Sequence, residues 1–235
     1  MELLLISNST NAGESYLEHA RAQIGHFLGD KPRKCLFIPY AAVSFSYEEY
    51  EKRVSDALQE FGHQIDSIHN YTYPAAALDN AEAIIVGGGN TFQLLRLLQE
   101  NNLLASIIRK VKEGIPYIGW SAGSNLTCPT IRTTNDMPIV EPVDFNALGL
   151  IPFQINPHYL DANPEGHAGE TREMRIQEFI EVNEGMYVVG LREGTMLRID
   201  EHSVTLLGPH KARIFRKGME PIELGPKDNL DFLLS

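Results

Sequence analysis

The chain has 235 residues, of which 43% are hydrophobic and 22% charged, and it carries a formal charge of −11 at neutral pH. This balance predicts a globular protein, which we expect to form one domain over residues 1–235, and the acidic charge argues against nucleic acids and anionic membranes as partners. No apolar run approaches the roughly 18 residues of a membrane span, and the N-terminus lacks the pattern of a signal peptide.

The first half of the chain alternates between short apolar stretches and amphipathic stretches. We expect strands at residues 3–7, 34–39, 64–68, 83–86 and 115–118, and helices at residues 14–28, 47–61, 75–79, 91–99 and 104–112. Strands that alternate with helices predict a parallel sheet with helices on both faces, which is an α/β fold. Ligands of such sheets bind at the carboxyl ends of the strands.

The second half begins with a polar, turn-rich stretch at residues 128–138, which we expect to form a loop of the kind that often carries function. A strand at 153–156, a loop at 161–169, a helix at 170–182 and a strand at 186–191 are expected next. Period-two stretches at 196–199, 204–207 and 212–215 predict antiparallel strands at a sheet edge. The expected fold is a mostly parallel α/β sheet with antiparallel strands at its C-terminal edge.

The two cysteines, Cys35 and Cys128, lie in apolar or strand-like surroundings without the spacing of a disulfide or a metal site. We therefore expect reduced thiols in the core and a cytoplasmic protein. No H-E-x-x-H motif or cysteine pair is present, so we expect neither a metal nor another cofactor.

The turn Gly119-Trp120-Ser121-Ala122-Gly123 follows a predicted buried strand and carries a single hydroxyl at its tip. Its small residues allow the sharp strand-to-helix turn of a nucleophile elbow, which would expose the Ser121 hydroxyl at the edge of the sheet. A match to this spacing arises by chance in about one chain in ten, so the hypothesis depends on the surrounding residues.

A nucleophilic serine needs a base, a group that orients the base, and N–H donors for the oxyanion. His158 follows Pro157 at the end of a predicted strand and is the predicted base, with His167 as its rival. Gly89, in a triple glycine after another strand, and Ala122 are the predicted oxyanion donors. The triple glycine also leaves an alternative from another class, a non-catalytic protein that binds a nucleotide or a small anion.

Two carboxylates are candidates for the group that orients the histidine. Asp136 lies in the polar loop and preserves the order serine, aspartate, histidine, whereas Glu193 lies at the end of a buried-looking strand. Each could equally be a solvated loop acid, which is the commonest state of such residues. Spacing does not decide between the two, but a strand end fixes a side chain better than a long loop does, so Glu193 is slightly favoured as the orienting group.

Several segments of the sequence together resemble the peptidase E family of α-aspartyl dipeptidases. The matching segments are residues 87–94, 119–123, 129–140, 155–158, 164–167 and 169–173. The similarity covers nearly the whole chain. It departs mildly at Ser124, where the family usually has a second small residue such as alanine, and we expect this hydroxyl to leave the turn intact.

The resemblance implies a cytoplasmic serine peptidase that needs no metal and removes an N-terminal Asp from Asp-X dipeptides. It implies a sheet related to the class I glutamine amidotransferases, with Ser121 as nucleophile and His158 as base. It leaves the choice between Asp136 and Glu193 open. The expected partners are small peptide substrates with an N-terminal Asp. The protein itself is expected to be a monomer or a homodimer. The alternative among enzymes is a related cyanophycinase-like peptidase.

An acidic protein that selects an acidic residue needs a positive group in its pocket, and a guanidinium can bind a carboxylate through two parallel bonds. Arg172, at the start of the helix after the 161–169 loop, is the predicted cation. Arg132, in the polar loop, is the alternative, and Asn90, beside the triple glycine, is a further predicted substrate contact.

Overall fold

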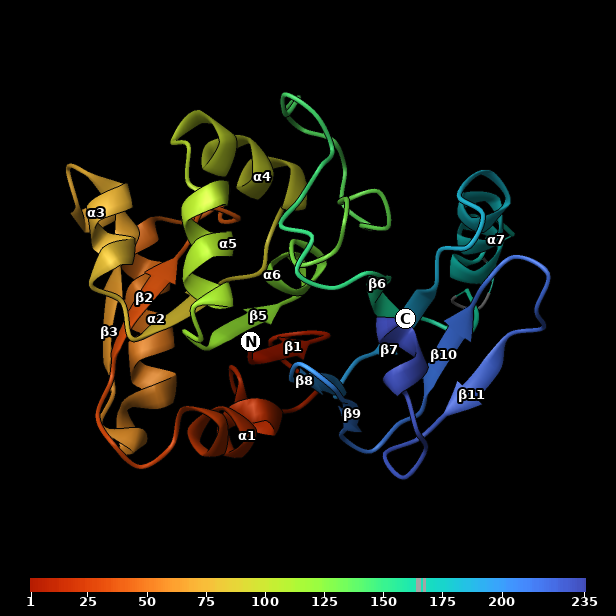
Figure 1. Ribbon diagram of the computed structural model, residues 1–235, viewed down its shortest axis with the longest axis horizontal. Helices are drawn as coiled ribbons and strands as arrows, with labels where there is room; N and C mark the ends of the chain where they lie inside the picture. Colours follow the sequence, from red (N-terminus) through yellow and green to blue (C-terminus); the bar gives the residue numbers. More distant parts are fainter. Residues whose placement is uncertain (164–165, 167) are drawn as a thin grey trace.

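Two sheets organise the computed structural model, which describes residues 1–163, 166 and 168–235 (Figure 1). The larger sheet has seven strands in the order β3-β2-β4-β5-β1-β8-β9, and the smaller has four in the order β11-β10-β7-β6. The strands of the larger sheet are β1 (Leu3–Ile6), β2 (Lys34–Ile38), β3 (Gln64–Ser67), β4 (Ala83–Val86), β5 (Tyr117–Trp120), β8 (Met196–Ile199) and β9 (Val204–Leu207). Those of the smaller sheet are β6 (Gln154–Tyr159), β7 (Val188–Arg192), β10 (Ala212–Phe215) and β11 (Ile222–Leu224).

Helices cover both faces of the larger sheet. The helices are α1 (Glu18–Leu28), α2 (Tyr47–Leu58), α3 (Pro74–Asp79), α4 (Thr91–Glu100), α5 (Leu104–Lys112), α6 (Ala122–Asn125) and α7 (Arg172–Val182), with short 3₁₀ turns η1 (Gln59–Phe61), η2 (Ile68–Asn70) and η3 (Asp231–Leu234). Successive side chains of a strand point to opposite faces, so Leu3 and Leu5 of β1 pack in the core with α3, α4 and α5, while Leu4 and Ile6 pack with α1 and α2.

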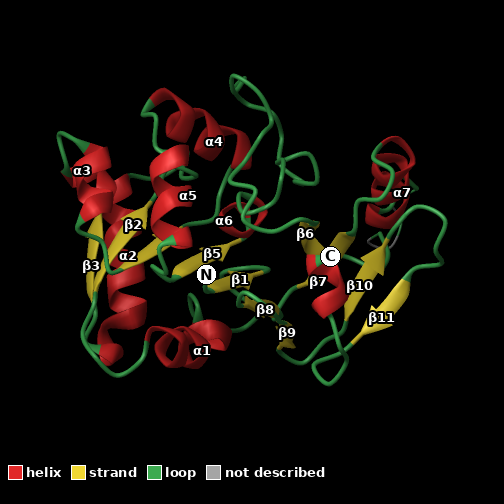
Figure 2. Cartoon of the chain, in the orientation of Figure 1, coloured by secondary structure: helices red, strands yellow, loops and turns green. Residues whose placement is uncertain are grey.

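The smaller sheet continues the same core. Ile155 of β6, Val189 of β7 and Ile214 of β10 belong to the hydrophobic cluster that also holds Leu3 and Leu5. Figure 2 shows α7 beside this sheet, and its residues Ile176 and Ile180 pack there against Val188 and Phe215. Because β6 and β7 are parallel, their carboxyl ends meet at one edge.

The α/β class and the mostly parallel sheet are confirmed. The tail differs from the prediction, because its strands divide between the two sheets. Strands β8 and β9 extend the larger sheet antiparallel to β1, whereas β10 pairs with β7 and with β11, a strand that the sequence pattern did not predict. An alternating pattern identifies a strand but not its partner, which here lies far away in the sequence.

Several element boundaries also differ from the prediction, among them those of α1 and β6. Helix α1 begins at Glu18, because the buried Leu17 before it takes a left-handed conformation with φ 58°. Strand β6 continues to Tyr159, so His158 lies inside the strand at a register shift rather than after its end. In the described part of the chain, no helix is long and apolar enough to cross a lipid bilayer.

Candidate active site

Ser121 occupies the sharp turn between β5 and α6, at the carboxyl edge of the larger sheet. Its backbone has φ 52° and ψ −111°, and its N–H donates to the Ile6 carbonyl of the neighbouring β1 at 3.0 Å. A non-glycine residue in this region costs about 1–3 kcal/mol and persists only where surrounding contacts enforce it. The turn therefore holds the serine hydroxyl out of the sheet, as the elbow hypothesis predicts.

Close backbone packing explains the small residues of this turn. A Cβ on Gly119 would lie 2.4 Å from the Gly123 carbonyl oxygen, and one on Gly123 would lie 2.2 Å from the Val86 carbonyl oxygen. The hydroxyl of Ser124 donates to the carbonyls of Ile6 at 2.7 Å and Gly119 at 2.8 Å, so it links the turn to both strands. The family departure at this position thus adds hydrogen bonds and leaves the turn in place.

His158 lies at the irregular part of β6, where its backbone has φ 53°. Its N–H donates to the Ser7 hydroxyl at 2.9 Å, and that hydroxyl donates to the Leu191 carbonyl at 2.7 Å. These bonds connect β6 to the segment after β1 and fix the imidazole above the serine turn. His158 Nε2 lies 2.9 Å from Ser121 Oγ.

Glu193 follows β7 directly and meets the histidine from its other side. Its Oε1 lies 2.7 Å from His158 Nδ1. The next residue, Gly194, donates its N–H to the Asn8 side-chain oxygen at 2.8 Å, which anchors the turn that carries the glutamate. A carboxylate at Nδ1 favours the tautomer with its proton on that nitrogen, which leaves Nε2 free to accept the serine proton.

Asp136 has different partners. Its Oδ2 accepts hydrogen bonds from the Thr91 N–H at 2.7 Å, the Thr91 hydroxyl at 2.5 Å and the Thr134 hydroxyl at 3.0 Å. The carboxylate thus lies at the N-terminus of α4, where a negative charge is favourable. Of the two candidate acids, the structure brings Glu193 and not Asp136 into contact with the histidine.

The triple glycine lies beside the serine turn and is held by helix α2. Gly89 has φ 134°, and a Cβ there would lie 2.2 Å from the Ala41 carbonyl oxygen, so only glycine fits. The buried hydroxyl of Tyr50 donates to the Gly88 carbonyl at 2.9 Å and accepts from Trp120 Nε1 at 3.1 Å. Because the Gly88 carbonyl and the Gly89 N–H belong to one peptide unit, these bonds fix the direction of that N–H.

Two backbone donors remain available next to Ser121. Among the described residues, neither the Gly89 N–H nor the Ala122 N–H donates to a protein acceptor. Gly88, Gly89, Ser121, His158 and Asp136 line one cavity of about 450 Å³. An oxyanion that forms in this cavity would meet donors fixed in advance.

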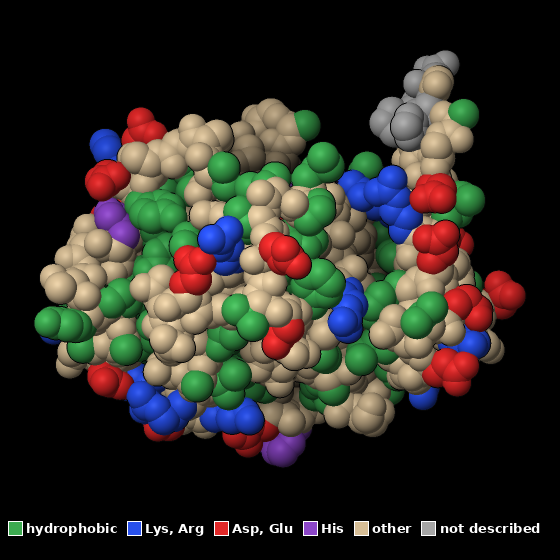
Figure 3. Space-filling model, turned by 90° about the horizontal axis from the view of Figure 1, so that it is seen from above, with side chains coloured by type: hydrophobic (Ala, Val, Ile, Leu, Met, Phe, Trp, Pro, Cys, Tyr) green, Lys and Arg blue, Asp and Glu red, His purple; other side chains and the backbone are tan. Residues whose placement is uncertain are grey.

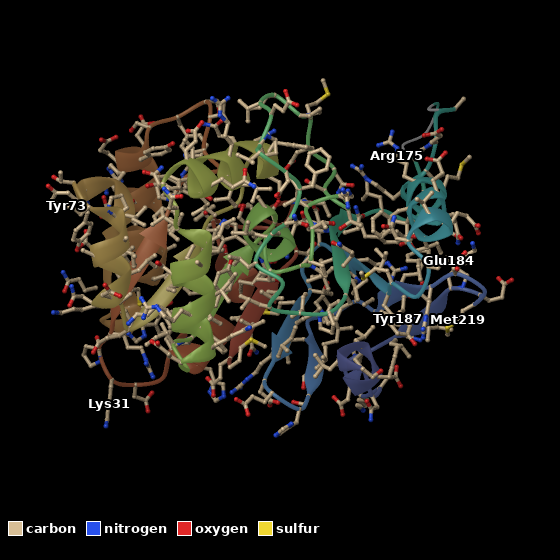
Figure 4. All side chains as sticks on the ribbon, turned by 45° about the horizontal axis from the view of Figure 1, so that its top comes forward. Lys31, Tyr73, Arg175, Glu184, Tyr187 and Met219 are labelled. Atoms are coloured by element: carbon tan, nitrogen blue, oxygen red, sulfur yellow. The ribbon has the colours of Figure 1, made fainter. Side chains whose placement is uncertain are left out.

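A second cavity, of about 180 Å³, shares the Asp136 wall with the first and is lined by three arginines. They are Arg132 of the polar loop and Arg172 and Arg175 of α7. The view from above shows one group of Lys and Arg side chains at the upper right of the molecule (Figure 3). Arg132 stacks over Phe145 at 5.4 Å, and Arg175, labelled in Figure 4, extends from α7. The cavity is therefore suited to an anion.

Arg172 is half-buried in this pocket. Burial, and then the charge of Arg175, lower the pKa of its guanidinium, while the Asp136 carboxylate raises it. A bound carboxylate would relieve both unfavourable effects on the charged guanidinium.

Comparisons with known proteins place the chain in a family. The model of peptidase family S51 matches residues 3–207. The chain belongs to peptidase family S51. This S51 chain is 53% identical over 232 residues to peptidase E of Nostoc sp. strain PCC 7120, covering 99% of the chain and 96% of the relative. It is 50% identical over 227 residues to peptidase E of Shigella flexneri serotype 5b, covering 96% of the chain and 99% of the relative.

The fold of the S51 chain also resembles the crystal structure of a peptidase from an acI-B1 Actinobacterium. The two share a TM-score of 0.73 at 17% identity, over 98% of this chain and 96% of the other. At this identity the likeness concerns the fold alone. The family match confirms the predicted resemblance and makes the protein a peptidase, hence a hydrolase.

Asn90 lies next to the site but does not line either cavity of the S51 chain. Its Oδ1 accepts from the Gln93 N–H at 3.0 Å as the cap of α4, and its Nδ2 donates to the Met137 carbonyl at 2.8 Å. These two hydrogen bonds hold the polar loop against the start of α4. His167, the rival base, lies outside the described residues.

Sequence reasoning missed several residues of the site, among them Arg175, Tyr50 and Ser7. Arg175 lies three positions after Arg172, a spacing that places both on one helix face and that could have indicated it. Tyr50 and Ser7 gave no such signal, because a tyrosine on the apolar side of a helix and a serine after a strand usually have structural roles. Their contacts depend on the pairing of distant elements.

Proposed function

We propose that this S51 peptidase is a serine-type dipeptidase that hydrolyses dipeptides with an N-terminal aspartate. The observation that carries the proposal is the arginine-lined cavity, which shares the Asp136 wall with the cavity of Ser121 and His158. A substrate whose carbonyl reaches Ser121 can extend an acidic side chain into that cavity. The peptidase E relatives support the reaction class.

In the proposed reaction, Ser121 Oγ attacks the carbonyl of the N-terminal Asp while His158 Nε2 takes its proton. Glu193 holds the imidazole and stabilises its positive charge. The N–H groups of Gly89 and Ala122 donate to the oxyanion. His158 then protonates the leaving amine, the peptide bond breaks, and an acyl-enzyme remains. His158 then takes a proton from a water molecule, which attacks the ester carbonyl, and it returns that proton to Ser121 Oγ as the ester bond breaks and free Asp is released.

Asp136 is proposed to bind the substrate's ammonium group. Its Oδ2 has three hydroxyl or N–H donors, whereas its Oδ1 has no partner among the described residues. It lines both cavities, between the nucleophile and the arginines. A carboxylate at this position suits a dipeptide with a free N-terminus, because its charge complements the ammonium.

The direct test is an assay of purified protein on Asp-Leu, with and without a chelator. We expect release of Asp and Leu in both cases, and labelling of Ser121 by a fluorophosphonate. Asn-Leu and the aspartyl polymer cyanophycin serve as comparison substrates. Hydrolysis of the polymer but not of Asp-Leu would favour a cyanophycinase, and absence of labelling and turnover would favour a non-catalytic anion binder.

Arg172→Met is expected to lower kcat/KM for Asp-Leu by about tenfold to over a hundredfold, since a hydrogen bond to a charged group contributes about 1.5–3 kcal/mol. The melting temperature should change little, because no ion pair within the described part of the chain involves Arg172. Steady-state kinetics on Asp-Leu and Asn-Leu measure the effect. Arg96→Met is the matched control, since Arg96 lines neither cavity and pairs with Glu100 at 2.7 Å. Unchanged discrimination between the two substrates in Arg172→Met would exclude Arg172 and point to Arg132.

Tyr50→Phe is expected to lower kcat for Asp-Leu by about tenfold to a hundredfold at nearly constant KM. Loss of a whole oxyanion donor costs about 10²–10³ in kcat, and loosening the Gly88 peptide should cost less. The matched control is Tyr47→Phe on the same helix, because the Tyr47 hydroxyl has no partner among the described residues. A lower melting temperature with unchanged kcat would show that Tyr50 serves only the fold.

We also propose that the enzyme works in the cytoplasm. Cys35 and Cys128 are free and buried, and burial raises the pKa of both thiols to about 12. Thiols of this kind are typical of reducing compartments.

A further inference from the structure

Arg53 is a cation in the cavity of Ser121 that the proposed reaction does not use. It extends from the middle of α2 and lines the 450 Å³ cavity together with Tyr16 and Phe45. Its guanidinium carbon lies 5.0 Å from the centre of the Phe45 ring and 5.7 Å from that of Tyr16. The two rings hold the arginine beside the reacting serine.

Arg53 also has no acidic partner in the part of the chain that the structure describes. Other exposed cations on helices do have such partners. Lys52, the neighbour of Arg53 on α2, pairs with Asp56 at 2.7 Å, and Arg96 on α4 pairs with Glu100 at 2.7 Å. The partners of the Arg53 guanidinium among the described residues are two aromatic faces, which attract a cation weakly at an exposed site. Its hydrogen-bond donors therefore remain free for an anion that enters the cavity.

A dipeptide brings two carboxylates to the enzyme. The side chain of its N-terminal Asp is assigned above to the pocket with Arg172. Its second carboxylate is the C-terminus, which lies one residue beyond the scissile bond. We infer that Arg53 binds this α-carboxylate, and that the rings of Tyr16 and Phe45 contact the side chain of the leaving residue. This inference rests on the proposed function and extends it to the leaving-group side of the site.

The assignment explains how the cavity can select dipeptides. In a longer peptide the second residue carries a neutral amide instead of a carboxylate, so the charge-assisted bond to Arg53 is lost. In a dipeptide, by contrast, the Asp carboxylate and the C-terminal carboxylate would be bound by two different arginines, which come from α7 and α2. The aromatic walls further favour an apolar second residue such as Leu.

The experiment compares Asp-Leu with Asp-Leu amide, which differ only in the C-terminal charge. For the wild-type protein we expect kcat/KM to be about tenfold higher for the free acid, a modest factor because Arg53 is exposed. Arg53→Met should lower the value for Asp-Leu by about tenfold and leave the amide unchanged, so that the preference disappears. Arg53→Lys should retain part of it.

The matched control is Lys52→Met, which removes the same charge from the adjacent position of α2, where the side chain is 75% exposed. It should keep the preference for the free acid, which separates a direct contact from a general effect of net charge. Equal losses on acid and amide in Arg53→Met, or no preference in the wild type, would overturn the subsite while Asp-Leu hydrolysis stands. A wild-type protein that leaves Asp-Leu intact would overturn the proposed function itself.

Discussion

Ser121→Ala should lower kcat for Asp-Leu by about 10⁶, because removal of the serine nucleophile in a comparable peptidase costs about that factor. The variant should still bind Asp-Leu, which calorimetry would measure, since its cavities and arginines are unchanged. It should also lose reaction with a fluorophosphonate. The melting temperature should shift only slightly, because among the described residues His158 is the one hydrogen-bond partner of the serine hydroxyl.

The matched control for this variant is Ser124→Ala, three residues further along the same turn. Its hydroxyl donates to the carbonyls of Ile6 and Gly119, so its loss should reduce stability by about 1 kcal/mol. Its kcat should stay within a few-fold of the wild-type value. If Ser121→Ala retained even a tenth of the wild-type kcat, another residue would have to be the nucleophile.

Features that depend on residues close together in the sequence, such as turns and single strands, could be predicted well. The elbow at Ser121 follows from an apolar stretch and small residues, and the structure adds the reason, which is that Gly119 and Gly123 pack backbone against backbone. The triple glycine beside it follows from the same argument, because Gly89 takes a conformation that favours glycine. The alternation of strands and helices was sufficient to predict the parallel sheet that the first half of the chain forms.

Pairing between distant elements could not be predicted. The choice between Asp136 and Glu193 depends on which strand lies beside β6, and the partner is β7 in a second sheet that no local pattern indicates. Parallel pairing of these strands brings Glu193 to His158. The loop that carries Asp136 instead folds onto the start of α4, where two threonines bind the carboxylate.

Glu193→Gln is expected to lower kcat for Asp-Leu by about 10³, with a small change in KM. An amide in place of the carboxylate can donate to Nδ1, which favours the wrong tautomer and leaves the imidazolium without its counter-charge. Loss of a buried triad acid costs about 10⁴, and a smaller factor is expected here because the Glu193 side chain is 47% exposed. Water can therefore stabilise part of the charge.

Asp136→Asn provides the decisive comparison, because it removes the other candidate acid. If Asp136 binds the ammonium group, this variant should raise KM for Asp-Leu and lower kcat less than Glu193→Gln does. Glu141→Gln, an exposed acid three residues beyond the polar loop, controls for the loss of one negative charge. Equal and small effects of Glu193→Gln and Asp136→Asn would mean that no carboxylate supports His158, and a larger loss of kcat in Asp136→Asn would reverse the two assignments. The expected order follows from one contact, the 2.7 Å approach of Glu193 Oε1 to His158 Nδ1.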